Sequence, residues 1–166
     1  MIRKFLLGAC IGGLLMGQVY EAPKEQLVKQ DKWSTDLGSS NQEKRSMAEG
    51  QLYQLARSKA ISNRAEAEAI YLQILASNPN CEPAHVRLAE IYLGRWNGLN
   101  NSPDKELGLQ HLRRAITLAN QNIQSISADK TPLLKQAAID HVLKLSQIEQ
   151  QVNQGVTGLG LDFPQY

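Results

Sequence analysis

Residues 67–92 read AEAIYLQILASNPNCEPAHVRLAEIY, and this stretch decides the fold class. Small residues such as Ala67 and Ala89 recur among large apolar residues that stand three or four places away. That spacing puts both kinds on one face of a helix, where a second helix can approach closely. Asn78-Pro79 ends the first helix, because proline disfavours the helical conformation in the residue before it. The stretch therefore predicts two packed helices joined by a short turn.

The order of these residues resembles the tetratricopeptide repeat (TPR) family. In that family one helix closes in Asn-Pro, as at residues 78–79, and the next carries the pattern L-A-x-x-Y. Here Leu88, Ala89 and Tyr92 match that pattern. The helix that follows repeats the small-large-small order of the family at Gly108, Leu112, Ala115 and Ile116.

The resemblance covers residues 48–120, and residues 131–152 are similar to a closing helix. The loop between Tyr92 and Gly108 is longer than a standard repeat allows, which resembles the sel-like, long-loop variant. The resemblance implies an all-α, short solenoid of helical hairpins that binds other proteins and does not catalyse. Because stable arrays usually have three units, the last helix or another subunit must cover the second unit.

Helix start signals support one helical domain at residues 41–152. Ser40 precedes Glu43 by three residues, which is the spacing of a capping box, and Asn63 and Glu66 repeat it. Ser102-Pro103-Asp104 and Thr131-Pro132 place a cap before a proline of the first turn. With no convincing strand, the chain is expected to be all-α with five helices. The residues expected to face inward include Met47, Leu52, Leu55, Ala56, Leu107, Leu112, Leu134, Leu145, Ile148 and Val152.

The segments that flank this domain lack a sustained apolar period. Residues 18–40 contain Pro23, Gly38 and mixed charges, which predicts a linker of low order. Gly155 suits the C-terminal cap of the last helix. Residues 153–166 are rich in glycine and are expected to form a flexible, extended tail.

The first 17 residues have the form of a targeting segment. Two cations precede an uncharged apolar run, as in a secretory signal, and the run is short for a membrane span. A signal peptide or an uncleaved anchor is one interpretation of residues 1–17. A second is a lipoprotein, because Leu7-Gly8-Ala9-Cys10 matches the lipobox and would make Cys10 the lipidated residue. A third is a buried structural helix. The first two predict a periplasmic or other extracytoplasmic location, with the membrane contacted through this segment.

Composition excludes some classes of function. The chain has 166 residues and a net charge of +2, and its cations are scattered among carboxylates rather than forming a basic stripe. Nucleic acid is therefore not an expected partner. The two cysteines, Cys10 and Cys81, do not make a disulfide framework, and no zinc-binding spacing occurs.

Histidine and cysteine are the candidates for chemistry. No two of His85, His111 and His141 have the i, i+4 spacing of a metal-binding helix. We therefore expect these histidines to have ordinary packing or surface roles, and we expect no cofactor. Cys81 stands four residues before His85, which could reach it and act as its base. The sequence marks no Asn or Asp that would orient this histidine. A small metal- or thiol-dependent enzyme built on these residues is the alternative to a binding protein.

The remaining candidate for a functional site is a surface that binds a partner. In proteins that this chain resembles, the first helix of each unit lines a concave groove. The corresponding positions in this chain are found by counting from Leu55-Ala56 in one unit and from Leu88-Ala89 in the next. The resemblance then implies a groove lined by Tyr53, Arg57, Val86, Glu90 and Leu93. Trp96, in the long loop, would be either packed over the second unit or presented to a partner.

These observations favour a non-catalytic adaptor that binds a protein or peptide partner. Together with the N-terminal segment, they predict an exported or membrane-tethered protein that assists the assembly of a larger envelope complex, such as a secretion or pilus machine. Besides the small enzyme, a structural homo-oligomer stays open, in which the open repeat face pairs with itself.

Overall fold

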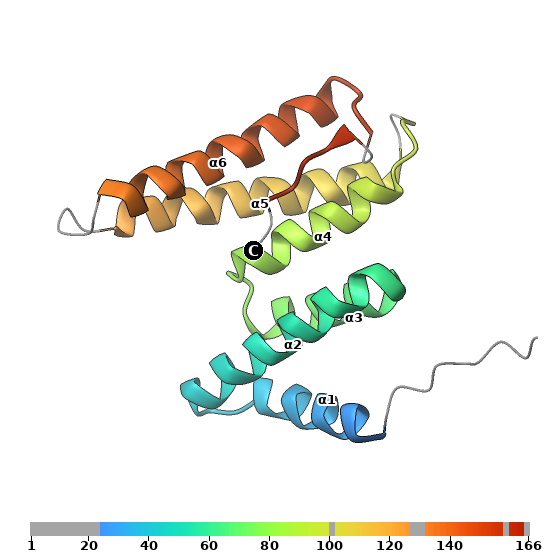
Figure 1. The fold of residues 1–166 in the computed structure, drawn as a ribbon, viewed down its shortest axis with the longest axis vertical. Helices are drawn as coiled ribbons and strands as arrows, with labels where there is room; N and C mark the ends of the chain where they lie inside the picture. Colours follow the sequence, from blue (N-terminus) through green and yellow to red (C-terminus); the bar gives the residue numbers. More distant parts are fainter. Residues whose placement is uncertain (1–23, 100–101, 127–131, 158–159, 165–166) are drawn as a thin grey trace, which may run out of the picture.

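The computed structural model describes residues 24–99, 102–126, 132–157 and 160–164, and these residues form helices without any strand. The predicted all-α class is therefore confirmed, with six helices in the described residues rather than five (Figure 1). They are α1 (Lys24–Leu37), α2 (Gln42–Ser62), α3 (Arg64–Ser77), α4 (Glu82–Arg95), α5 (Pro103–Ser125) and α6 (Pro132–Asn153).

Each helix packs mainly on its neighbours in the sequence. The most extensive contacts join α4 to α5 and α2 to α3, and α1 also touches α3. Figure 1 shows the result as a stack that runs from α1 at one end to α6 at the other. Short connections between helices favour this arrangement, because consecutive helices must then lie side by side.

Helix α4 is buried on two sides and separates two hydrophobic cores. One side of α4 presents Leu88 and Ile91 to a core that α1, α2 and α3 complete. The other side presents Val86, Ala89 and Leu93 to a core shared with α5, α6 and the C-terminal segment. The apolar residues of α4 therefore follow two helical stripes rather than one, and nine of its residues are buried.

Three of the predicted start signals stand at or next to a helix start. One of them, Ser102, is the N-cap residue of α5 but makes no side-chain capping hydrogen bond. Asn63 caps α3 as predicted, because its side chain accepts the Glu66 backbone N–H at 3.2 Å. Helix α2 is capped by Asn41 rather than Ser40: the Asn41 side chain accepts the N–H groups of Glu43 and Lys44. The expected cap was thus one residue early. Thr131 lies outside the described residues.

Helix α6 ends at a left-handed glycine. Gly155 has a φ of +91°, and its N–H donates to the carbonyl of Val152 at 3.0 Å. The next N–H, of Val156, reaches back to the carbonyl of Gln151 at 2.9 Å. This pair of bonds is a Schellman motif, which favours glycine at that position. Gly155 therefore takes the predicted role.

The prediction of a low-order linker at residues 18–40 is wrong over residues 24–37, which form α1. Leu37 is buried in the first core and Trp33 packs against it. In addition, the Ser77 hydroxyl donates to the Leu37 carbonyl at 3.0 Å, which fixes the end of α1 to the end of α3. These tertiary contacts supply the stability that the polar sequence of α1 lacks by itself. Residues 18–23 lie outside the described residues.

The prediction of a flexible tail at residues 153–166 is also wrong where the tail is described. Figure 1 shows this segment turning back along α5 and α6 after the end of α6. Phe163 is only 5% exposed in the second core, and Leu161 packs against the same core. Asp162 forms an ion pair with Lys144 of α6 at 2.9 Å. The tail therefore covers part of the second core.

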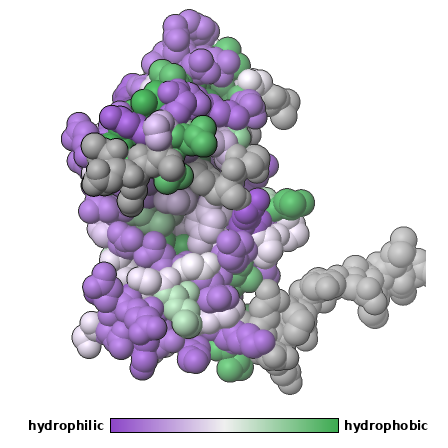
Figure 2. Space-filling model, turned by 60° about the vertical axis from the view of Figure 1, so that its left-hand side comes forward, coloured by the Kyte–Doolittle hydropathy of each residue, from purple (hydrophilic) through white to green (hydrophobic). Residues whose placement is uncertain are grey.

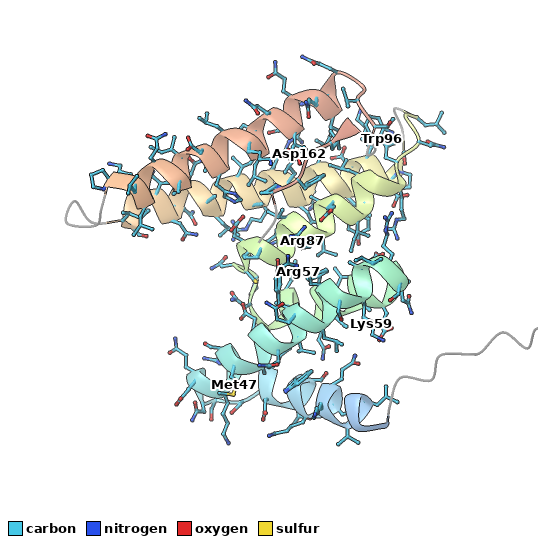
Figure 3. All side chains as sticks on the ribbon, in the orientation of Figure 1. Met47, Arg57, Lys59, Arg87, Trp96 and Asp162 are labelled. Carbon is cyan, nitrogen blue, oxygen red and sulfur yellow. The ribbon has the colours of Figure 1, made fainter. Side chains whose placement is uncertain are left out.

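Three residues expected to face inward are exposed instead: Met47, Leu107 and Leu134. In α2 the buried residues are Ala48, Leu52, Leu55 and Ala56, so the inward face starts one residue after Met47, which Figure 3 labels. In α6 the buried residues are Leu145, Ile148 and Val152, all in its C-terminal half. Leu134 stands in the first turn of α6, before the part that packs into the core.

Candidate binding cleft

A cleft of about 280 Å³ opens where α2, α3 and α4 meet. Figure 3 shows Arg57 of α2 and Arg87 of α4 close together at this place. The lining combines three guanidinium groups, one carboxylate, one phenol and a small apolar wall. The lining residues are Arg57, Ala60, Ile61, Arg64, Tyr71, Arg87, Glu90 and Ile91.

Helical periodicity brings most of these residues to one place. Residues 57, 60 and 61 share one face of α2 by the spacing i, i+3, i+4. Residues 87, 90 and 91 share one face of α4 by the same rule. The Asn63 cap joins α2 directly to α3, so Arg64 stands at the cleft in the first turn of α3.

Arg87 is the most constrained charge of the cleft. It is only 5% exposed, its Nη1 donates to Glu90 Oε2 at 2.6 Å, and its Nε donates to the Tyr53 hydroxyl at 3.4 Å. Burial alone would lower the pKa of Arg87, but the hydrogen bonds with Tyr53 and Glu90 outweigh it and raise that pKa. Arg87 is therefore a charged, oriented donor at the floor of the cleft.

Tyr71 contributes a buried hydroxyl. Its side chain is fully buried, and its ring meets the Tyr53 ring edge-on, with the centroids 5.6 Å apart. Among the described residues, the Tyr71 hydroxyl has no hydrogen-bond partner, a state that typically costs about 1–3 kcal/mol. Burial raises the pKa of Tyr71, so the group stays protonated and can donate.

Two further arginines stand at the rim. Arg57 and Arg64 are exposed, and within the described part of the chain neither forms an ion pair. Arg64 extends over α4, where its Nη1 lies 3.4 Å from the position of a Cβ built on Gly94. The lining therefore carries three arginines against one glutamate, and two of the arginines are available to a ligand.

The structure divides the predicted groove residues into two groups. Arg57 and Glu90 line the cleft, and half-buried Tyr53 supports it through Arg87 and Tyr71. Val86 and Leu93 do not: both are fully buried in the second core, so the prediction that they line a groove is wrong. The groove prediction assumed that α4 has only one buried face, whereas α5 covers a second face of α4.

Trp96 is packed in the second core rather than presented to a partner. It is 3% exposed, and its Nε1 donates to the Leu99 carbonyl at 2.8 Å. The Lys105 ammonium lies 4.7 Å from the centre of its ring, in a cation–π contact. Of the two alternatives for this residue, the structure therefore excludes the exposed one.

The postulated pair of Cys81 and His85 does not form. Burial raises the pKa of the Cys81 thiol to about 12, which keeps it protonated and unreactive at neutral pH. His85 uses both ring nitrogens elsewhere: Nε2 lies 3.1 Å from the Pro79 carbonyl and Nδ1 lies 2.9 Å from Nδ1 of His111. Neither group is in the state that nucleophilic catalysis requires.

Sequence reasoning missed the contact between His85 and His111. Because a carbonyl only accepts, His85 carries its proton on Nε2, and His111 donates from Nδ1 to the Nδ1 of His85. Tyr92 stacks on the His111 ring with a centroid separation of 5.6 Å. His141 lies apart and contacts Glu82 at 2.9 Å. Among the described residues, no group of three or more potential ligands could hold a metal ion.

Sequence reasoning also missed Arg64, Tyr71 and Arg87 as residues of the cleft. The spacing that places Arg87 and Glu90 on one face of α4 was available as a signal. What the sequence could not give was the packing of α3 on α2 and of α4 on α3, which brings residues of all three helices to one cleft. Cys10, the candidate for lipidation, lies outside the described residues.

Comparisons with protein-family models, with curated proteins and with solved structures give no match to this chain. In the part of the chain that the structure describes, no helix combines the length and apolar character that crossing a bilayer requires.

Proposed function

We propose that this chain is a non-catalytic adaptor whose cleft binds a protein or peptide partner. The observation that carries the proposal is the set of arginines at the meeting point of α2, α3 and α4. Arginine and tyrosine are the residue types that most often anchor interfaces, because they offer several contacts from one side chain. A cleft that already orients Arg87 also spares part of the entropic cost of binding.

The state of the candidate catalytic groups supports binding over catalysis. A nucleophile needs a lowered pKa or a neighbouring base, and buried Cys81 has neither. Apart from Glu90, which is paired with Arg87, the charged groups of the cleft are arginines, which do not exchange protons at neutral pH and act as fixed hydrogen-bond donors. Recognition of an acceptor is the chemistry that such groups perform best.

The remainder of the proposal rests on the sequence. The apolar run of residues 1–17 supports export or membrane tethering, and with it a role in assembling an envelope complex. A TPR-like architecture is part of the same proposal. It is supported by packing of consecutive helices and by Gly108, which lets α5 approach Leu93 of α4 closely.

The test is recovery of a partner with the tagged full-length chain from solubilised membranes and extracytoplasmic fractions of its native cells. We expect a defined protein to copurify with the wild type, and Arg57→Glu to reduce its recovery at least about tenfold by reversing a rim charge. Arg45→Glu is the matched control, because Arg45 is an exposed arginine of the same helix outside the cleft. The absence of any copurifying protein, or equal losses in both variants, would refute the adaptor.

A further inference from the structure

We propose that the cleft at α2, α3 and α4 is a recognition site for a side-chain carboxylate, aspartate or glutamate, flanked by an apolar residue in the partner. This inference deepens the proposed adaptor function and rests on it. It names the chemistry that the partner presents: one negative charge directed to the arginines, and one apolar group beside it.

Charge complementarity is the first observation. Three guanidinium groups and one carboxylate line the cleft, and the carboxylate of Glu90 is already bound to Arg87. The exposed pair Arg57 and Arg64 lies on either side of the turn at Asn63, Arg57 in α2 and Arg64 in the first turn of α3, and both line the cleft. A single carboxylate placed between these two arginines and Arg87 would accept charge-assisted hydrogen bonds, which are roughly twice as strong as neutral ones.

The hydroxyl of Tyr71 is the second, independent observation. It belongs to a fully buried side chain that lines the cleft, and among the described residues it has no hydrogen-bond partner. A buried hydroxyl without an acceptor is unfavourable, so a ligand that supplies an oxygen gains that energy. The hydroxyl is covered in the free chain, so a ligand that bonds to it must displace the side chains that cover it.

The apolar wall defines the second half of the ligand. Ala60 and Ile61 of α2 and Ile91 of α4 line the cleft beside the arginines, and Ile61 is 95% exposed. An apolar side chain of a partner would cover Ile61 and remove that surface from water. The volume of about 280 Å³ falls at the lower end of ligand sites, so the cleft accommodates one or two side chains.

A carboxylate fits this cleft better than a phosphate group does because of the apolar lining. The attraction of the arginines and the repulsion of Glu90 both scale with the ligand's charge, so charge alone does not separate the two groups. Apolar Ile61 and Ile91 favour a ligand whose charge is small relative to its carbon surface. We therefore assign the site to a peptide segment with an acidic and an apolar residue.

The experiment uses the full-length chain and an array of end-blocked peptides. Each peptide carries one central glutamate between leucine, isoleucine or phenylalanine residues, and matched peptides carry glutamine or phosphoserine at the same position. We expect at least about tenfold stronger retention of the chain on the best glutamate peptides than on their glutamine counterparts. Retention that is equal on both sets, or strongest on phosphoserine, would overturn the assignment.

Substitutions locate the site. Arg57→Glu should weaken binding of the best glutamate peptide at least about tenfold, whereas Arg45→Glu should leave it unchanged. Tyr71→Phe removes only the hydroxyl, so it should weaken binding about threefold or more without lowering the midpoint of urea unfolding. Unchanged binding in Arg57→Glu would show that the cleft is not the site. Unchanged binding in Tyr71→Phe would remove the hydroxyl from the site.

The two proposals fail in different ways. If a cellular protein copurifies with the wild type and is lost with Arg57→Glu, while the peptide array shows no preference for glutamate, the adaptor stands and the carboxylate assignment is refuted. If nothing copurifies, the adaptor itself fails, whatever the peptide array shows.

Discussion

His85 and His111 form a contact between two neutral rings at the junction of α4 and α5. Burial, and then the charge of His85, lowers the pKa of His111 to about 4. Burial also lowers the pKa of His85, with Arg114 acting in the same direction and with Pro79 and Glu82 opposing. Each ring is therefore neutral in the folded chain at neutral pH, as their mutual hydrogen bond requires.

This contact predicts a loss of stability in mild acid. An unfolded histidine titrates near pH 6.5, so between about pH 6.5 and 4 the unfolded chain binds more protons than the folded one. Stability is therefore complete above pH 6.5 and falls as the pH approaches 4. At 1.36 kcal/mol per pKa unit, the full loss from His111 down to pH 4 is roughly 3 kcal/mol, of which about 2 kcal/mol falls above pH 5. Urea unfolding of the full-length chain at pH 7 and pH 5 measures this second part.

The control for this prediction is the double variant His85→Gln, His111→Gln, which removes both titrating rings. Its free energy of unfolding should change less between pH 7 and pH 5 than that of the wild type. Working above pH 5 keeps most carboxylates ionised, so their titration contributes little. An equal change in the two proteins would show that the pair does not control acid stability.

At the scale of elements, Gly108 sets the separation of α4 and α5. A Cβ built on Gly108 would lie 2.5 Å from Cγ of Leu93, which is too close, and 3.3 Å from its backbone nitrogen, which is a tight contact. Gly108→Ala should therefore destabilise the chain by about 1–3 kcal/mol, the usual cost of overpacking. Thermal and urea unfolding would measure this loss.

Gly50 provides the matched control, because it is also inside a helix but has no atom within 4 Å of a built Cβ. Gly50→Ala should stabilise the chain by about 0.5–1 kcal/mol through helix propensity alone. Both substitutions gain that propensity, so the difference between them isolates the contact with Leu93. Equal effects of the two would mean that α4 and α5 are not in close contact at this point.

Much of the helical core could be predicted from local patterns. The stripe of Leu88 and Tyr92, the Asn63 cap and the glycine end of α6 are each decided by residues within one or two turns. Helix α1 could not be predicted in this way. Its polar sequence is stabilised by contacts of Trp33 and Leu37 with α2 and α3, which no local spacing reveals.

Long-range packing also explains the other predictions that failed. The burial of Phe163 depends on a return of the chain across the second core. Val86 and Leu93 were predicted to line a groove, but they lie on the side of α4 that α5 covers. Arg57 and Glu90 do line the cleft, and that a partner binds them there stays a prediction.

At the scale of the whole molecule, α4 holds the two cores together, and the cleft lies on the side of the first core. The surface in Figure 2 is mainly hydrophilic with scattered hydrophobic residues, so broad apolar patches do not dominate this face. Binding directed by a few charged and aromatic side chains is the mode of recognition that suits such a surface.

The central claim is that a partner occupies the cleft, and site-specific photo-crosslinking tests it most directly. A photoreactive residue replaces Ile61, which is exposed and lines the cleft, or Leu143, an exposed residue of α6 outside it. Illumination of native cells should give one protein adduct of defined mass from position 61 and none from position 143. The adduct should disappear when Arg57→Glu is added. No adduct at position 61, or the same adduct from both positions, would contradict the account.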